Sequence, residues 1–260
     1  MLFVLSPAKT LDFAPPPPDL RATAPELKPD TAKLAKLARR LKGSDLKRMM
    51  DISDSLAELN VARFKAFAKA PEESGVQAAL AFAGDVYTGL DARNLDVEAL
   101  EWAQDRVRIL SGLYGVLRPL DRIQPYRLEM GVRLASDRGR NLYDFWGAKP
   151  ARQLNQAGKD HPDPTVVNLA SQEYFGAVDM QALKLPLLIC LFKEEKDGEA
   201  RVISFFAKIA RGLMARFAIE RRIERAEDLK AFDTAGYRFR PELSADREWV
   251  FVRPQPPLKS

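Results

Sequence analysis

The chain has 260 residues, of which 46% are hydrophobic, so it can bury a large core near the upper size of a single domain. Its net charge of +5 is too small by itself to indicate a polyanionic partner. Cys190 and His161 are the only cysteine and histidine, which excludes an internal disulfide framework and any zinc, haem or iron–sulfur site built from those residue types.

We expect a protein that uses no cofactor and makes no contact with a membrane. No apolar run approaches the length that crosses a bilayer. The apolar stretch from Met1 to Leu5 meets Ser6 and Pro7 at once, which favours a buried strand over a signal peptide. A hard-cation site made only of carboxylates stays open, because Asp and Glu are abundant, although no EF-hand spacing is present.

The first third of the chain is predicted to form that strand, a proline-rich surface connection and three helices. The prolines of residues 15–18 fix φ and remove backbone donors, which favours extended chain. From Asp30, apolar residues recur at helical spacing until Gly43 ends the pattern. Ser44 and Ser53 then stand where the N-caps of two further helices are expected.

Strands and helices alternate through the middle of the chain. Residues 78–90 are predicted as a strand that leads into a glycine-punctuated turn. Asp96 is the expected N-cap of a helix that ends at the glycines of residues 111–115. A further helix is predicted over residues 148–156 and a short strand over residues 165–169.

The last third contains the clearest hairpin. Residues 187–193 and 201–205 are apolar runs joined by a turn with an Asp-Gly pair, and we expect both strands in the middle of the core. A long helix over residues 206–222 and an edge strand over residues 249–252 follow.

Together these elements predict one mixed α/β (α+β) domain over residues 1–253, with a central sheet and flanking helices. The sequence shows neither an internal repeat nor a linker that would divide it. Residues 254–260 are rich in proline and are expected to form a mobile tail.

The predicted helix over residues 206–222 has a basic side. At about 100° per residue, Phe206 and Phe217 fall on one side, whereas Lys208 and Arg211 fall nearly opposite. An ordinary solvated face is one interpretation of such charges. The lack of acidic residues on that side favours a phosphate-binding surface, because a merely solvated helix usually interleaves both signs.

Residues 110–118 suggest a second phosphate contact. A helix, a tight glycine turn and a short second helix would form a helix-hairpin-helix, whose backbone N–H groups hold a phosphate without reading sequence. The residues predicted to contact DNA there are Gly112, Leu113, Gly115, Arg118 and Arg122. The glycine spacing is one residue too long and Pro119 would shorten the second helix, so a glycine-terminated helix is the competing interpretation.

Lys9 and nearby carboxylates are the catalytic candidates. Ser6 and Lys9 formally match the Ser-x-x-Lys arrangement of acyl-transferring serine enzymes, but the companion Ser-Asp-Asn and Lys-Thr-Gly elements are missing. Lys9 follows a buried strand, and α/β folds place ligands at such strand ends. Glu129, Asp144 and Glu173 are the carboxylates to test, although their spacing does not identify a pair.

Several long segments resemble, in order, the motifs of the YaaA family of peroxide stress proteins. These segments are residues 6–12, 84–90, 110–121, 125–131, 168–171 with 173–175, and 203–205 with 210–214. The resemblance implies a bacterial cytoplasmic protein that is linked to hydrogen peroxide resistance and to lowering available iron, and so to limiting oxidative damage to DNA. It also implies a mixed α/β fold with a helix-hairpin-helix and a positively charged cleft that binds DNA, with Lys9, Lys208 and Arg211 as cleft candidates.

We therefore expect a monomeric DNA-binding protein that contacts mostly the backbone, with weak sequence preference. The alternative is an enzyme that acts on nucleic-acid bases or nucleotides, with Lys9 as nucleophile or electrostatic group and Glu129 or Glu173 as acid–base partner. A third possibility is direct iron sequestration by carboxylates, although no iron site is evident in the composition, so any effect on iron is expected to be indirect.

Overall fold

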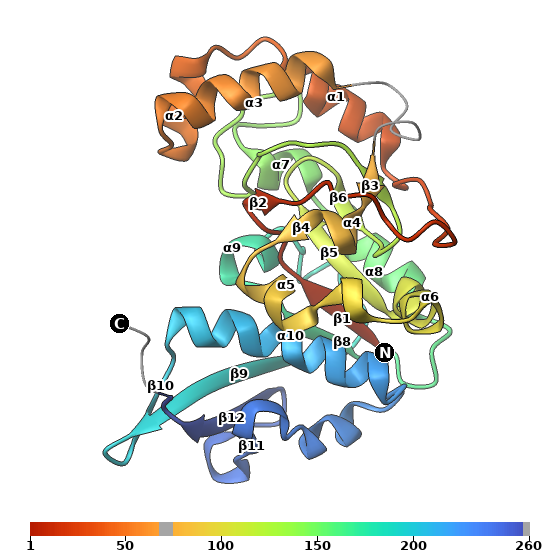
Figure 1. The fold of residues 1–260 in the computed structure, drawn as a ribbon, viewed down its shortest axis with the longest axis vertical. Helices are drawn as coiled ribbons and strands as arrows, with labels where there is room; N and C mark the ends of the chain where they lie inside the picture. Colours follow the sequence, from red (N-terminus) through yellow and green to blue (C-terminus); the bar gives the residue numbers. More distant parts are fainter. Residues whose placement is uncertain (68–74, 257–260) are drawn as a thin grey trace.

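A mixed eight-stranded sheet forms the middle of the molecule, in the order β11-β12-β9-β8-β1-β5-β6, with β10 paired to β9 (Figure 1). The computed structural model describes residues 1–67 and 75–256. The parallel strands are β12 (Glu248–Pro254), β9 (Leu187–Lys196), β8 (Val166–Leu169), β1 (Leu2–Leu5) and β5 (Val107–Ser111). The antiparallel strands are β6 (Gly115–Leu117), β10 (Glu199–Arg201) and β11 (Arg238–Phe239).

Helices pack on this sheet and complete one compact domain, which confirms the mixed α/β prediction. Leu2, Phe3, Val4 and Leu5 are all 0% exposed, as a central parallel strand requires. Around this strand, α10 (Ser204–Glu220) packs on β9, β1 and β8. On neighbouring strands, α6 (Val97–Arg106) packs on β1 and β5, and α8 (Lys149–Gly158) packs on β1 and β6. No helix within the described ranges is long and apolar enough to cross a bilayer.

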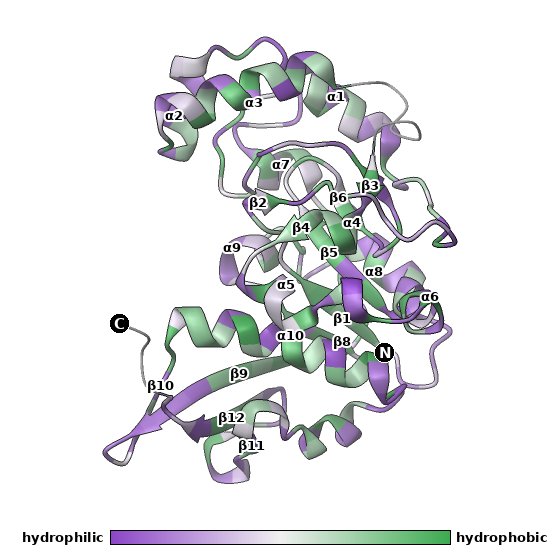
Figure 2. Cartoon of the chain, in the orientation of Figure 1, coloured by the Kyte–Doolittle hydropathy of each residue, from purple (hydrophilic) through white to green (hydrophobic). Residues whose placement is uncertain are grey.

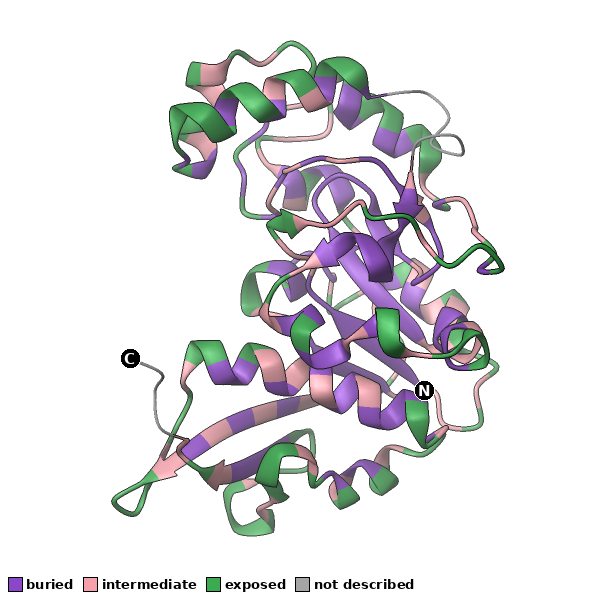
Figure 3. Cartoon of the chain, in the orientation of Figure 1, coloured by how far each residue is buried: buried purple, intermediate pink, exposed green. Residues whose placement is uncertain are grey.

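Three helices form a cap at one end of the molecule: α1 (Lys28–Ala38), α2 (Gly43–Met50) and α3 (Asp54–Ala66). Their outer sides are exposed, whereas the central strands are buried (Figure 3). Ser53 caps α3 as predicted, because its Oγ accepts a hydrogen bond from the Leu56 backbone N–H at 3.3 Å. The predicted cap Ser44 is wrong: α2 begins at Gly43 and its N-cap is Lys42.

The segment over residues 78–90, predicted as a strand that leads into a glycine-punctuated turn, is mostly helical. It forms α4 (Ala78–Ala81), a two-residue strand β4 (Phe82–Ala83) paired with β2 (Thr10–Leu11), and α5 (Asp85–Leu90). Close packing of α5 against α10 gives the reason. A Cβ on Gly212 would lie 1.8 Å from the Val86 carbonyl oxygen, and one on Gly89 would lie 2.1 Å from the Ile209 carbonyl oxygen. Only glycines allow this approach, and their pairing across the chain is invisible to local periodicity.

The helix-hairpin-helix prediction is wrong, and so is the glycine-terminated helix. Asp96 caps α6 as predicted, but α6 ends at Arg106 and residues 107–117 form the β5–β6 hairpin, with Ile109 opposite Leu117. The apolar run of β5 pairs with β1 and is buried along its whole length. Tertiary pairing thus overrides the helical continuation that the local pattern suggested.

The β9–β10 hairpin is confirmed around Asp197 and Gly198, whose φ values of 53° and 80° fit a tight hairpin turn. In Figure 2, β9 changes from hydrophobic to hydrophilic toward this turn. The predicted return strand over residues 201–205 is wrong, because β10 ends at Arg201 and α10 begins at Ser204. β12 is not an edge strand, since it lies between β9 and β11.

The remaining elements are short. They are β3 (Val76–Gln77) paired with β7 (Arg122–Ile123), α7 (Leu142–Trp146), α9 (Gln172–Phe175), η1 (Ala92–Asn94), η2 (Ala226–Ala231), η3 (Thr234–Gly236) and η4 (Pro241–Leu243). β12 continues to Pro254, and the Gln255 backbone N–H donates to the Glu195 carbonyl at 2.9 Å, so the ordered chain extends past residue 253. Of the predicted mobile tail, residues 257–260 lie outside the described residues.

Candidate nucleic-acid interface

The loops that leave β1 and β8 diverge. These strands are neighbours, but β1 pairs on its far side with β5, whereas the chain after β8 goes to β9 on the opposite side. Ligands of open α/β sheets bind at such topological switch points, outside the carboxyl ends of the strands. The Ser171 backbone N–H donates to Ser6 Oγ at 2.9 Å, and the Tyr87 hydroxyl donates to the Ser6 carbonyl at 3.0 Å. Ser6 therefore joins the two loops at the switch point.

Lys9 and Glu129 come together beside this junction. Lys9 Nζ lies 2.8 Å from Glu129 Oε2, and Arg127 Nη2 lies 2.9 Å from Glu129 Oε1. The side chains of Glu129 and Arg127 are largely buried, whereas that of Lys9 is 60% exposed. One carboxylate is thus shared by two cations, and the Lys9 ammonium still faces solvent.

Arg63 of α3 adds a third cation that the sequence analysis missed. Its side chain is half-buried, and it forms neither a hydrogen bond nor an ion pair with any residue in the described ranges. Burial and the neighbouring Arg127 guanidinium lower the pKa of Arg63. Lys9 and Arg127 therefore share one carboxylate, and Arg63 adds a further positive charge near Arg127.

Glu173 reaches the same loop, whereas Asp144 does not. Glu173 Oε1 accepts a hydrogen bond from the Gly131 backbone N–H at 3.0 Å. Burial raises the pKa of the Tyr174 phenol, and the nearby charges of Glu173 and Glu129 raise it further. Asp144 instead accepts from the Arg140 backbone N–H at 2.8 Å within its own loop. The structure thus gathers Lys9, Glu129 and Glu173 at one place.

On α10, Lys208 lies next to the loop after β1. Lys208 Nζ is 3.5 Å from Asp85 Oδ2, and a Cβ on the preceding Gly84 would lie 3.3 Å from Ala8 Cβ. Arg211 lies one turn further along and has no hydrogen-bond or ion-pair partner within the described part of the chain. Burial lowers the pKa of its guanidinium.

The basic side of α10 is therefore not the open face that its helical wheel suggested. At about 100° per residue Ala215 falls on the same side of α10 as Arg211, and it is 0% exposed. Arg211 is itself half-buried, and its charge stands without an acidic partner in the described part of the chain. Such a group is costly to desolvate unless an anion compensates it.

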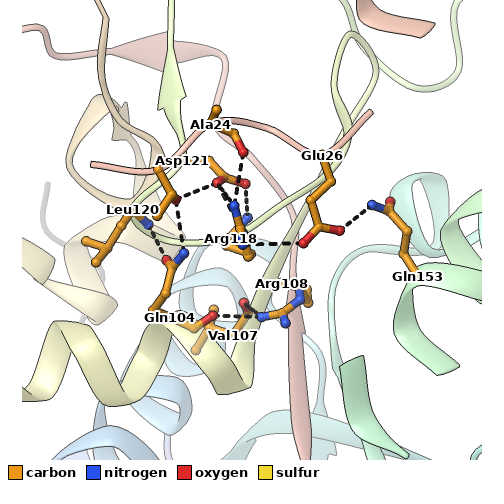
Figure 4. Close-up of polar contacts among 10 residues, drawn as sticks. Ala24, Glu26, Gln104, Val107, Arg108, Arg118, Leu120, Asp121 and Gln153 are labelled. Atoms are coloured by element: carbon orange, nitrogen blue, oxygen red, sulfur yellow. Dashed lines mark hydrogen bonds and ion pairs between the residues drawn. The ribbon is translucent and has the colours of Figure 1, made fainter. Parts of the chain in front are cut away.

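Arg118 belongs to a separate network, which is shown in Figure 4. Its Nη2 lies 2.8 Å from Asp121 Oδ1, and its Nη1 lies 3.4 Å from Glu26 Oε1. Asp121 is 0% exposed and also accepts from Thr23 Oγ1 at 2.6 Å. Arg118 is thus matched by two acids and ties the chain before α1 to the β5–β6 hairpin.

The other predicted hairpin contacts are occupied by the fold. Leu113 is 0% exposed, and a Cβ on Gly112 would lie 2.2 Å from the Leu128 carbonyl oxygen. Gly115 has φ +74° and packs against Trp146. Arg122 lies in β7, opposite Gln77. The backbone of residues 112–115 therefore packs against neighbouring chain and does not form the turn between two helices that a helix-hairpin-helix requires.

Among the described residues, Cys190, His161 and the acids do not gather into a metal site. Within residues 1–67 and 75–256, no group of three or more His, Cys, Asp or Glu side chains is placed to hold an ion. Burial raises the pKa of the Cys190 thiol to about 12. His161 Nδ1 lies 3.0 Å from the Met1 carbonyl oxygen, at the end of β1 opposite to Ser6.

Fold and site define an α/β protein whose cationic side chains gather where connections from neighbouring parallel strands diverge. A profile of the family described as Peroxide stress protein YaaA matches residues 1–243. A UPF0246 protein of Phenylobacterium zucineum is 66% identical over 257 residues, which cover 99% of this chain and 96% of the relative. A UPF0246 protein of Caulobacter vibrioides is 64% identical over 98% of this chain and 100% of its own, and one of Cereibacter sphaeroides is 53% identical over 97% and 99%. The chain belongs to the YaaA family of peroxide stress proteins, which confirms the predicted family.

Proposed function

We propose that this protein of the peroxide stress family binds DNA, and that the backbone lies across the divergence of β1 and β8. The observation that carries the proposal is the unmatched charge there. Lys9 and Arg127 share the single carboxylate of Glu129, Arg63 adds a positive charge near Arg127, and Arg211 has no acidic partner within the described ranges. Phosphates are suited to such a group, because charge-assisted hydrogen bonds to guanidinium offset its desolvation.

The arrangement of the elements supports contact with a long ligand. In Figure 1, α3, β2, α9 and the first half of α10 follow one another along the same side of the molecule. Arg63 comes from α3, Lys9 from the segment before β2, and Lys208 with Arg211 from α10. A strand that spans these elements would meet several cations in succession, through backbone contacts that carry little sequence information.

Salt-dependent fluorescence anisotropy with Arg211→Gln tests the proposal. We expect the variant to bind DNA about tenfold more weakly. Its affinity should also depend less steeply on salt, because binding releases about one counterion fewer. Arg238→Gln is the matched control, because Arg238 is 66% exposed on β11 and has Asp233 within 3.9 Å. Unchanged affinity in Arg211→Gln, Arg63→Gln and Lys208→Gln alike would remove the proposed surface.

A second candidate function is an enzyme on nucleic-acid bases or nucleotides, as the 2.8 Å contact between Lys9 Nζ and Glu129 Oε2 suggests. Glu129 could take a proton from the ammonium, after which the neutral amine could attack the sugar C1′. The C1′–base bond would break, the damaged base would leave with the proton held by Glu129, and opening of the sugar ring would give an imine to Lys9. Borohydride trapping on damaged-base oligonucleotides would capture the resulting imine. Lys9→Arg keeps the charge but not the nucleophile, so it should retain DNA binding and lose trapping. Absence of any trapped product with the unmodified protein would exclude the lysine-nucleophile mechanism.

The lowering of available iron that the family resemblance implies stays a prediction. If it is direct, equilibrium dialysis of the protein against ferrous iron will show stoichiometric binding. If it is indirect, the protein will bind DNA but retain no iron above the buffer concentration.

A further inference from the structure

We propose that Phe205 is a stacking platform for an unpaired nucleobase, so that the interface prefers nucleic acid with unstacked bases over an intact duplex. This rests on the proposed DNA-binding function and adds the structural class of ligand. Phe205 is 51% exposed in the first turn of α10, and every other aromatic side chain in the described ranges is at least partly buried. An exposed phenyl ring on a surface rich in cations is what nucleobases stack on in single-strand binding proteins.

The ring of Phe205 is supported by the side chains on which it packs. It packs against Phe206 with 5.4 Å between the ring centroids and an interplanar angle of 61°. Phe206 is itself 8% exposed, and the Arg253 guanidinium carbon lies 4.9 Å from its ring centroid. Arg253 in turn lies 3.4 Å from Glu194, which is fully buried. A backing this well fixed leaves one face of Phe205 open without freedom to collapse onto the protein.

A cation beside Phe205 is placed to meet the phosphate of a nucleotide whose base stacks on the ring. Lys208 is three residues further along α10, on the adjacent position of the same helix surface. Its ammonium is half-exposed beside Asp85 and the loop that carries Lys9. A base that stacks on Phe205 would therefore have its phosphate beside Lys208, and the strand would continue toward Lys9.

The exposed apolar surface at this junction is small. Val202, at 55% exposed, is the only other large apolar side chain that is exposed within residues 199–210. Two side chains fall far short of the area that a stable protein interface buries, roughly 1,000 Å². They are also too few for an amphipathic helix that inserts into a membrane. A single planar base covers one phenyl ring, so the observations favour a nucleobase.

The experiment compares single-stranded DNA carrying one 2-aminopurine with a blunt duplex of the same sequence. Affinity is measured by anisotropy over a series of salt concentrations, and stacking by 2-aminopurine fluorescence. We expect the full chain to bind the single strand more tightly and to change its fluorescence. Phe205→Ala should weaken single-strand binding by roughly 5- to 100-fold with unchanged salt dependence, while duplex binding stays within about twofold.

Matched variants separate stacking from other effects. Phe205→Tyr should keep single-strand affinity, Phe205→Leu should lose it, and Leu243→Ala, which removes an exposed side chain of η4, should change nothing. The proposal is overturned if Phe205→Ala binds the single strand like the unmodified protein, if both DNA forms weaken equally, or if Phe205→Leu binds normally. It is also overturned if Phe205→Ala loses binding to anionic phosphatidylserine vesicles but not to DNA. Failure of the DNA-binding function itself would differ, because the unmodified protein would then show no salt-dependent binding to either DNA.

Discussion

Two groups of arginines in this protein carry the same charge and have opposite surroundings. Arg118 is matched by Asp121 and Glu26 in the network of Figure 4. Arg127, by contrast, shares Glu129 with Lys9 beside the switch point between β1 and β8, and the nearby Arg63 has no ion-pair partner in the described part of the chain. The first group holds two segments of the chain together, and the second leaves positive charge unmatched. A basic residue therefore indicates a ligand site only where the fold places no acidic residue beside it to match its charge.

The largest expected effect is a loss of stability when the acidic partner of Arg118 is removed. Asp121→Asn removes the charge opposite Arg118 at a fully buried position that also accepts from Thr23. We expect a loss of about 3–5 kcal/mol in the free energy of unfolding, because the partner cation is left uncompensated. Urea denaturation measures this loss. Asp137→Asn is the control, since Asp137 is 71% exposed and its contact with Lys33 is long, at 3.9 Å. Equal stability of the two variants would contradict a structural role for the Arg118 network.

A smaller loss of stability is expected at low pH, at a second site where a carboxylate is paired with two cations. Asp30 is 8% exposed, with Lys149 Nζ at 2.6 Å and Arg138 Nη1 at 2.7 Å, and these contacts tie α1 to the rest of the molecule. Burial alone would raise the pKa of Asp30, but the hydrogen bonds from Lys149 and Arg138 outweigh it and lower that pKa. The folded pKa is then below the unfolded pKa of about 3.9, so the stabilisation is complete above the unfolded value and is lost as the pH falls through the folded one.

Asp30→Asn tests this sign directly. We expect the variant to be less stable by about 1–3 kcal/mol at pH 7, since hydrogen bonds between charged groups are lost. The difference from the unmodified protein should shrink as the pH is lowered below about 4. Urea midpoints at pH 7, 5 and 3 measure it. A difference that stays constant over this range would show that the Asp30 charge is not what stabilises α1.

The smallest effect on stability should come from the unmatched group. Arg63→Gln removes a cation that is repelled by Arg127, so the free energy of unfolding should change by no more than about 0.5 kcal/mol. DNA affinity should nevertheless fall, and the salt dependence should decrease by about one counterion. Arg48→Gln is the control, because Arg48 is 76% exposed on α2 and pairs with Asp45. If Arg63→Gln destabilised the fold and left DNA binding intact, the contrast between the two groups would be reversed.

Local signals predicted the elements that depend on residues a few positions apart. Ser53 and Asp96 cap their helices as expected, because a cap needs only a side-chain oxygen and the backbone N–H three residues later. The buried strand β1 and the tight turn of the β9–β10 hairpin were likewise predicted. The largest errors fell on residues 78–90 and 107–117, where apolar residues fit more than one periodicity. There the partner strand or helix decided the outcome.

The candidate site was predicted in part. Lys9, Glu129 and Glu173 were singled out separately, and the structure gathers them at one edge of the sheet. Arg63 and the exposed ring of Phe205 were missed. Arg63 lies on α3, where a basic residue in a charged helix gives no signal, and exposure of one phenylalanine among apolar neighbours cannot be read from composition.

By itself the sequence determined the family, the class of fold, the N-caps of α3 and α6 and the central buried strand. It also limited His and Cys to one residue each, which constrains metal chemistry whatever the fold. Only the tertiary structure decided which cations are matched by acidic residues and which are not. Lys9 meets Glu129 and Arg118 meets Glu26 across long stretches of chain. Coulomb energies depend on distances of a few ångströms, and separation along the sequence does not fix those distances.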